Sequence, residues 1–139
     1  MNFNAKRFLT MTALIISGEA IFSLPFVVAR IFRPTLLESF EISNLELGTA
    51  FSLYGIIAMI SYLPGGTLAD RFSAKSMMSA SLLTTALGGI VYAQIPTLYW
   101  LKWIFAFWGL TTILLFWAAI IRATRQWGGV DGQGRAFGI

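Results

Sequence analysis

Charged residues are few in this sequence of 139 residues, and two of their positions suggest chemistry. The first is the segment 66–75, Gly-Thr-Leu-Ala-Asp-Arg-Phe-Ser-Ala-Lys, a short charged turn between two long apolar runs. Its acid Asp70 and its bases Arg71 and Lys75 could make and break an ionic contact where two helices meet water. The second is Glu19, a single acid near the centre of the first apolar run. An ionised acid inside a membrane costs roughly 2.5–3.5 kcal/mol, so such a group normally faces a cavity or a partner.

The composition is that of an integral membrane protein. Hydrophobic residues make up 57% of the chain and charged residues only 12%, against roughly 25% charged residues in soluble domains. The absence of Cys and His excludes disulfides, thiol nucleophiles, Cys/His zinc sites and histidine relays, and we predict no enzymatic activity, metal or cofactor. The net charge of +4 does not indicate nucleic-acid binding, because the basic residues flank the apolar runs. The expected macromolecular environment is therefore membrane lipid.

Four apolar runs are long enough to cross a bilayer, and we predict an all-α membrane protein with four transmembrane helices. About 20 apolar residues, at 1.5 Å each, cross a hydrocarbon core of about 30 Å. Pro25 should kink the first helix, and the segment 43–46, Ser-Asn-Leu-Glu, fits a capping box that begins the second. The predicted spans are residues 8–29, 45–68, 77–95 and 98–121, with a loop at 69–76 and a tail at 122–139.

The basic residues predict the orientation. Four spans put both ends of the chain on one side, and that side has seven basic residues against three on the other. The positive-inside rule therefore places both termini and the loop at 69–76 in the cytoplasm, beneath an inner (plasma) membrane. The seven residues are Lys6, Arg7, Arg71, Lys75, Arg122, Arg125 and Arg135, and the three are Arg30, Arg33 and Lys102.

The turn after the second span has the residues of a gate. The preceding Pro64-Gly65-Gly66 allows the helix to bend and a neighbouring backbone to approach. Asp70 could cap the N-terminus of a facing helix, or pair with Arg122 or Arg125 at the same depth. Such a contact forms in one arrangement of the helices and breaks in another. The alternative is that the two bases of the turn only follow the positive-inside rule, which leaves the acid unexplained.

This turn resembles the loop between helices 2 and 3 of the major facilitator superfamily, whose members carry small solutes across membranes. The family pattern is a glycine, an aspartate four residues later, an adjacent base and a further base. The chain departs from the pattern at Ser73, where glycine is usual, and at Ser76, where a second base is common. The matching residues of the cytoplasmic gate motif are Gly66, Asp70, Arg71 and Lys75.

The resemblance extends over the whole chain. Residues 42–48 look like the polar entry to the second helix, and residues 133–138 like the approach to a fifth, as in members described loosely as nitrate/nitrite or sugar-phosphate porters. Because the family's carriers have twelve helices in two halves, the resemblance implies that residues 1–139 are a truncated part of the N-terminal six-helix bundle, with the remaining helices missing. It implies a secondary, ion-coupled carrier of a small solute, working by alternating access. The alternative is a self-contained four-helix scaffold or partner subunit without transport activity.

The first span contains candidate pathway residues. At 100° per residue, Glu19, Ser23, Phe26, Arg30 and Arg33 fall on one helical stripe. Glu19 is interpreted as a site for a proton or a cationic group, with a static hydrogen bond to another helix as the alternative. Arg30 and Arg33 either snorkel to the outer interface or attract an anionic substrate at the outer mouth.

The third and fourth spans carry packing patterns. Ala80, Thr84 and Gly88 form a ridge of small residues that predicts close contact between helices. The aromatic residues of the fourth span, including Trp103 and Trp108, are interpreted as lipid-facing or packing groups.

Overall fold

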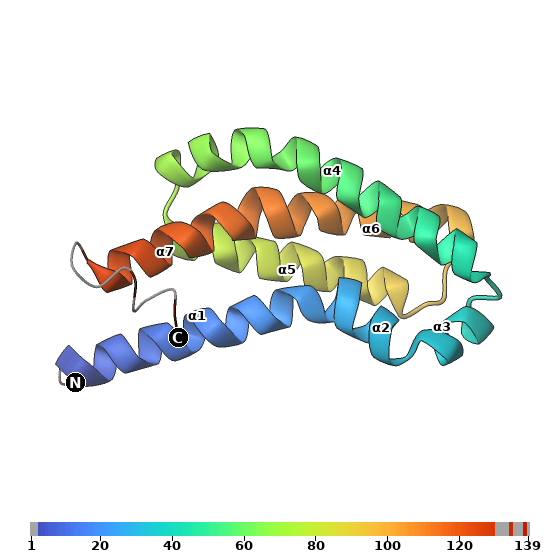
Figure 1. Cartoon of the computed structure of the whole chain (residues 1–139), viewed down its shortest axis with the longest axis horizontal. Helices are drawn as coiled ribbons and strands as arrows, with labels where there is room; N and C mark the ends of the chain where they lie inside the picture. Colours follow the sequence, from blue (N-terminus) through green and yellow to red (C-terminus); the bar gives the residue numbers. More distant parts are fainter. Residues whose placement is uncertain (1–2, 130–133, 135–137, 139) are drawn as a thin grey trace.

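The computed structural model describes residues 3–129, 134 and 138, with side chains from Ala5 onward. Figure 1 shows long helical rods lying side by side: α1 to α2, α4, α5, and α6 to α7, which are called the first to fourth rods below. The described part of the chain is all-helical and contains no strand, which confirms the predicted fold class at this level. The elements are α1 (Phe3–Phe22), the π-helical η1 (Ser23–Val28), α2 (Ala29–Ile31), α3 (Arg33–Ser39), α4 (Asn44–Arg71), α5 (Ala74–Tyr92), α6 (Leu98–Gly109), the π-helical η2 (Leu110–Trp117) and α7 (Ala118–Gly128).

Three helices among the described residues are long and apolar enough to cross a membrane: Ala5–Ile31, Asn44–Arg71 and Leu98–Gly128. They coincide with the first, second and fourth predicted spans. The 19-residue helix α5 lies beside them and is about 28 Å long. The helix α5 contains Lys75 and several serines and threonines, and it is not among these three candidate spans. Its crossing of the membrane therefore stays a prediction, as does the count of four spans.

Serine side chains begin two of the long helices. Ser43 accepts a hydrogen bond on Oγ from the backbone N–H of Glu46 at 3.2 Å, and its own N–H donates to Glu46 Oε2 at 2.8 Å. This reciprocal arrangement confirms the predicted capping box. At the start of α5, the N–H of Ser76 donates to Ser73 Oγ at 3.1 Å. Ser73, which stands where the family usually has glycine, therefore caps the N-terminus of α5.

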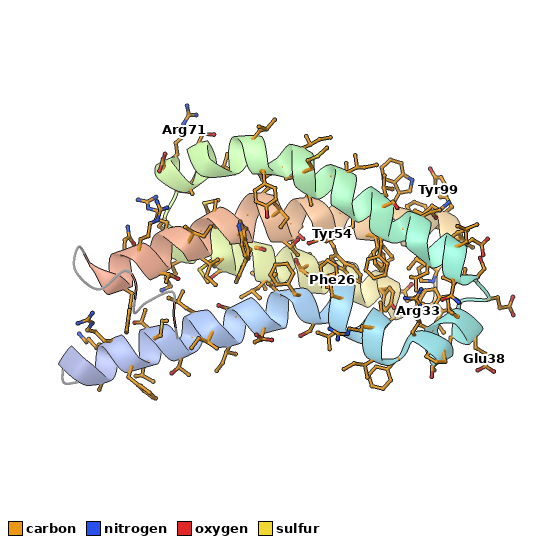
Figure 2. The ribbon with its side chains drawn as sticks, in the orientation of Figure 1. Phe26, Arg33, Glu38, Tyr54, Arg71 and Tyr99 are labelled. Atoms are coloured by element: carbon orange, nitrogen blue, oxygen red, sulfur yellow. The ribbon has the colours of Figure 1, made fainter. Side chains whose placement is uncertain are left out.

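The first rod is not one continuous α-helix. Pro25 cannot donate a backbone hydrogen bond, and the chain around it adopts the wider π-helical turns of η1. The helix breaks again at Phe32 before α3 begins. Phe26 turns toward α4, where its ring centroid lies 4.9 Å from that of Tyr54 (Figure 2). The prediction of one continuous stripe ending at Arg33 is therefore wrong, because it assumed 100° per residue throughout.

A buried polar cluster joins α4, α5, α6 and η2. Its hydroxyl and indole groups are all hydrogen-bonded, which matters because an unpaired polar group costs several kcal/mol in an apolar interior. The cluster lies on the face of α5 that carries Thr85, one position away from the predicted ridge through Thr84. The contacts are Tyr54 Oη to Thr112 Oγ1 at 2.7 Å, Thr85 Oγ1 to Thr111 Oγ1 at 2.8 Å, and the donation from Trp108 Nε1 to the carbonyl oxygen of Thr85 at 3.0 Å.

The rods α4 and α6 touch backbone to backbone at Gly109. A Cβ atom added at this glycine would lie 2.5 Å from the carbonyl oxygen of Tyr54 and 3.3 Å from the nitrogen of Ala58. Only a residue without a side chain fits this crossing. The crossing fixes how α4 is positioned against the fourth rod, and so where the charged turn after α4 lies.

Candidate functional site at the charged end of the bundle

Most of the basic residues are at one end of the bundle. The start of α1, the end of α4, the start of α5 and the end of α7 meet there, whereas α3 and the start of α6 lie at the opposite end (Figure 1). Figure 2 shows the same separation for Arg71 at the charged end and for Arg33 and Glu38 at the other. The described residues do not include Arg135 or most of the segment 133–138, the predicted approach to a fifth helix. The described basic residues at the charged end are Lys6, Arg7, Arg71, Lys75, Arg122 and Arg125.

The charged turn is attached to α7 by an arginine. The guanidinium of Arg122 donates from Nη1 to the carbonyl oxygens of Ala69 and Phe72, the latter at 3.0 Å. These carbonyls lie at the C-terminal end of α4, where unpaired carbonyl groups carry partial negative charge. A cation from α7 therefore stabilises the end of α4 and joins two rods that lie 50 residues apart in the sequence.

Four predicted site residues share one groove. Gly66 and Asp70 of α4 and Arg122 and Arg125 of α7 line a cavity of about 520 Å³. Asp70 is exposed and forms no ion pair with any described side chain, so its pairing with either arginine stays a prediction. The groove nevertheless places one carboxylate and two guanidinium groups around the same space, as a switchable ionic contact requires.

The remaining residues of the motif lie apart from this groove. Arg71 is exposed at the end of α4, and Lys75 lies on a different groove, between α1, α5 and α7. Close packing is made by Gly65, which is buried with Leu114 and Ala118 of the fourth rod as neighbours. A Cβ at Gly66 would meet nothing within 4 Å, so this glycine leaves the groove open.

The predicted pathway residues do not form one cluster. Glu19 is exposed on α1, and Ser23 Oγ donates to its backbone carbonyl at 2.9 Å, not to its carboxylate. Arg30 is exposed eleven residues farther along the rod, beyond the π-helical segment η1. Arg33 begins α3 and donates from Nε to Asn44 Oδ1 at 2.7 Å, which ties α3 to the start of α4. The roles of these residues in binding an ion or a solute stay predictions.

A second contact between rods at the charged end has no counterpart in the sequence analysis. Arg7 Nη2 donates to the carbonyl oxygen of Trp127 at 3.0 Å, and Trp127 Nε1 donates to the carbonyl oxygen of Arg7 at 2.8 Å. The guanidinium carbon also lies 5.0 Å from the centroid of the indole ring, within cation–π range. These residues are 120 positions apart, so no local pattern could pair them. The contact joins the start of α1 to the end of α7.

Comparison with known proteins gives relatives of greater length. The chain is similar to the inner membrane protein YqcE of Escherichia coli (strain K12), with 32% identity over 96% of this chain and 31% of that protein. It is also similar to the inner membrane protein YihN of the same strain, with 25% identity over 96% of this chain and 32% of that protein. An uncharacterized protein MG294 homolog of Mycoplasma pneumoniae is 28% identical over 93% of this chain and 30% of its own length. The chain thus spans about a third of the length of these curated relatives.

No solved structure gives a significant match to the chain. The model of the Major Facilitator Superfamily matches residues 9–139, which is nearly the whole sequence. The match includes the charged turn, α1 from residue 9, and all the later described helices. This chain therefore belongs to the Major Facilitator Superfamily, as its sequence predicts.

Proposed function

We propose that this chain forms part of a secondary carrier that moves a small solute across an inner membrane by alternating access. Membership of the superfamily, three membrane-capable helices and relatives named as inner membrane proteins support the proposal. The observation that carries it is the charged turn, where Arg122 binds backbone carbonyls of the turn while the carboxylate of Asp70 faces a groove. We place this end of the bundle and both termini in the cytoplasm, and we take α5 as a fourth crossing.

The turn works as a gate because Arg122 is held in place by the turn, whereas the carboxylate of Asp70 can change its partner. Arg122 holds the end of α4 through carbonyl groups, so α4 and α7 move together. Asp70 remains exposed and binds, in one conformation, a positively charged helix N-terminus or a cation on an adjoining bundle. In the other conformation that contact is lost, and Arg125 on the same groove becomes the partner of the carboxylate. The exchange of partners opens and closes the cytoplasmic side.

The coupling ion binds at Glu19 in this proposal. Glu19 lies near the middle of the candidate span Ala5–Ile31 and is exposed on α1, where it can face a transport pathway. An acid at this depth is suited to reversible binding of a proton or a cationic group. Arg30 and Arg33 lie toward the opposite end and attract an anionic solute at the outer mouth. The solute class favoured by these charges is a small organic or inorganic anion.

Labelling of single cysteines tests the orientation, because the chain has no cysteine of its own. Ser76→Cys places a thiol at an exposed position of the predicted loop 69–76, and Thr97→Cys places one at an exposed position just before α6. We expect a membrane-impermeant maleimide to label Ser76→Cys only in inside-out vesicles and Thr97→Cys only in right-side-out vesicles. The reverse result would overturn the cytoplasmic placement of the turn.

Uptake into proteoliposomes tests transport and the gate. The chain is reconstituted together with the remaining helices that a carrier of this family requires, and is supplied with a panel of organic and inorganic anions under an imposed proton gradient. For a transported anion, Asp70→Asn should lower uptake at least fivefold, since conformational couplings are typically about 1–3 kcal/mol. Glu38→Gln, an exposed acid at the other end, is the matched control and should leave uptake unchanged. Undiminished uptake by Asp70→Asn would remove the turn from the mechanism, and lack of uptake by the parent protein with the remaining helices present would favour the scaffold or partner-subunit alternative.

A further inference from the structure

A second groove at the charged end is not used by the proposed transport mechanism. It lies between α1, α5 and α7 and has a volume of about 840 Å³. Its lining is mainly apolar, and the residues from α1 and α7 belong to helices that are able to cross a membrane. The groove therefore has an apolar surface at the depth of the lipid acyl chains. The apolar lining residues include Leu9, Ala13 and Leu14 of α1, Met78 and Leu82 of α5, and Ala123 of α7.

The charges around this groove are positive. Lys75 lines it from the first turn of α5 and is exposed. Lys6 lies one turn before Leu9 and Thr10, two residues that also line it, so Lys6 is on the same face of α1. No acidic side chain is among the lining residues, and Asp70, the one acid of the described chain at this end, lines the other groove. This combination is complementary to an anion with an apolar tail.

One wall of the groove is held in place by the contact between Arg7 and Trp127. The indole of Trp127 lines the groove, and its N–H donates to the backbone of α1 at 2.8 Å. The guanidinium of Arg7 packs over the same ring and donates to the backbone of α7. The separation of α1 and α7 at this end is therefore set by direct bonds, which gives the groove a defined width.

We propose that this groove binds an anionic phospholipid from the adjoining leaflet. One acyl chain packs between α1, α5 and α7, and the phosphate lies beside the ammonium group of Lys75. Basic pockets between membrane helices bind anionic head groups, and lysine stems can lie along apolar surface while the ammonium reaches the interface. The proposal is independent of the transport function and of the orientation of the chain, because it concerns whichever leaflet meets the charged end.

Fluorescence quenching by labelled lipid tests the proposal. Ala13→Cys places a fluorophore in the groove, and Leu63→Cys places one on α4, where the side chain is 83% exposed. The chain is reconstituted in phosphatidylcholine vesicles that contain nitroxide-labelled phosphatidylglycerol or nitroxide-labelled phosphatidylcholine. We expect phosphatidylglycerol to quench the probe at position 13 more strongly than phosphatidylcholine does, and both lipids to quench the probe at position 63 equally.

Charge variants connect the preference to Lys75. Lys75→Gln should lower the preference for phosphatidylglycerol about fivefold, since one basic residue at a membrane surface is worth about 1 kcal/mol. Lys75→Arg should retain the preference, and Lys102→Gln, at the opposite end, is the matched control and should not change it. Circular dichroism of each variant establishes that the helices are intact.

Three results would overturn the proposal. Equal quenching of the probe at position 13 by the two lipids would mean that the groove does not select an anionic lipid. An unchanged preference in Lys75→Gln would place the selecting charge elsewhere. Loss of the preference when soluble glycerol phosphate is added would mean that the site recognises a free phosphate and not a membrane lipid.

Discussion

The crossing of α4 and α6 at Gly109 supports a quantitative prediction. In Gly109→Ala the new Cβ would lie 2.5 Å from a backbone oxygen and 3.3 Å from a backbone nitrogen. Neither atom can move like the end of a flexible side chain, so the two rods must separate. The perturbation therefore tests whether direct backbone contact positions α4, the helix that carries the charged turn.

The magnitude follows from a comparison with a second glycine. Overpacking of a well-packed contact typically costs about 1–3 kcal/mol. The same substitution also raises helix propensity by about 1 kcal/mol, which partly hides that cost. Gly55→Ala on α4 is the matched control, because a Cβ at this position would meet nothing within 4 Å. The propensity gain is common to both variants, so Gly109→Ala should be less stable than Gly55→Ala by about 1–3 kcal/mol.

The assay is unfolding of the purified chain in mixed micelles. Loss of helical circular dichroism is followed as the fraction of sodium dodecyl sulfate rises, and the free energies of unfolding of the two variants are compared by linear extrapolation. Equal stability of the two variants would refute the backbone contact. If Gly55→Ala were less stable than Gly109→Ala, the assignment of Gly55 to an open face of α4 would be refuted.

Two further substitutions test other contacts by the same titration. Ser43→Ala removes the Oγ acceptor for the N–H of Glu46 and should lower the free energy of unfolding by about 1 kcal/mol. An unchanged free energy of unfolding would show that the capping box is not formed. Tyr54→Phe removes the buried hydroxyl bonded to Thr112 and should cost about 0.5–1.5 kcal/mol, whereas a gain in stability would contradict that bond. A third substitution, Trp127→Phe, is tested by amide hydrogen exchange. It removes the indole N–H that donates to the backbone of α1, so exchange at the start of α1 should accelerate about fivefold. Exchange at the start of α4 is the control and should not change.

Local features of the fold could be predicted from the sequence. The capping box at Ser43 was predicted because its hydrogen bonds join residues only three positions apart. The membrane class and three of the spans follow from apolar runs of sufficient length. The disturbance at Pro25 was also expected, because proline lacks the N–H that an α-helix needs. Its form, a π-helical segment, was not predicted, and this error misplaced Arg33 on the helical stripe.

The packing of α5 shows why the buried faces were harder to predict. Small residues at Ala80, Thr84 and Gly88 predicted one ridge. Gly88 is buried against Trp108, as predicted, yet Ala80 is exposed and the neighbouring Ser81 and Thr85 are buried. Both sets have helical spacing, so periodicity alone could not choose between them. The choice depends on where the indole of Trp108 enters from the fourth rod, because it donates to the carbonyl of Thr85.

The sequence by itself determined that this chain is a helical membrane protein of the superfamily, and it located the charged turn. Only the tertiary structure decided that Arg122 binds the carbonyls of the turn, that Lys75 lies on a separate groove, and that Arg7 holds Trp127. The physical reason is the range of the interactions. Helix formation and capping depend on neighbours within about four residues, whereas these contacts depend on the rotation and separation of rods whose residues are 50 to 120 positions apart.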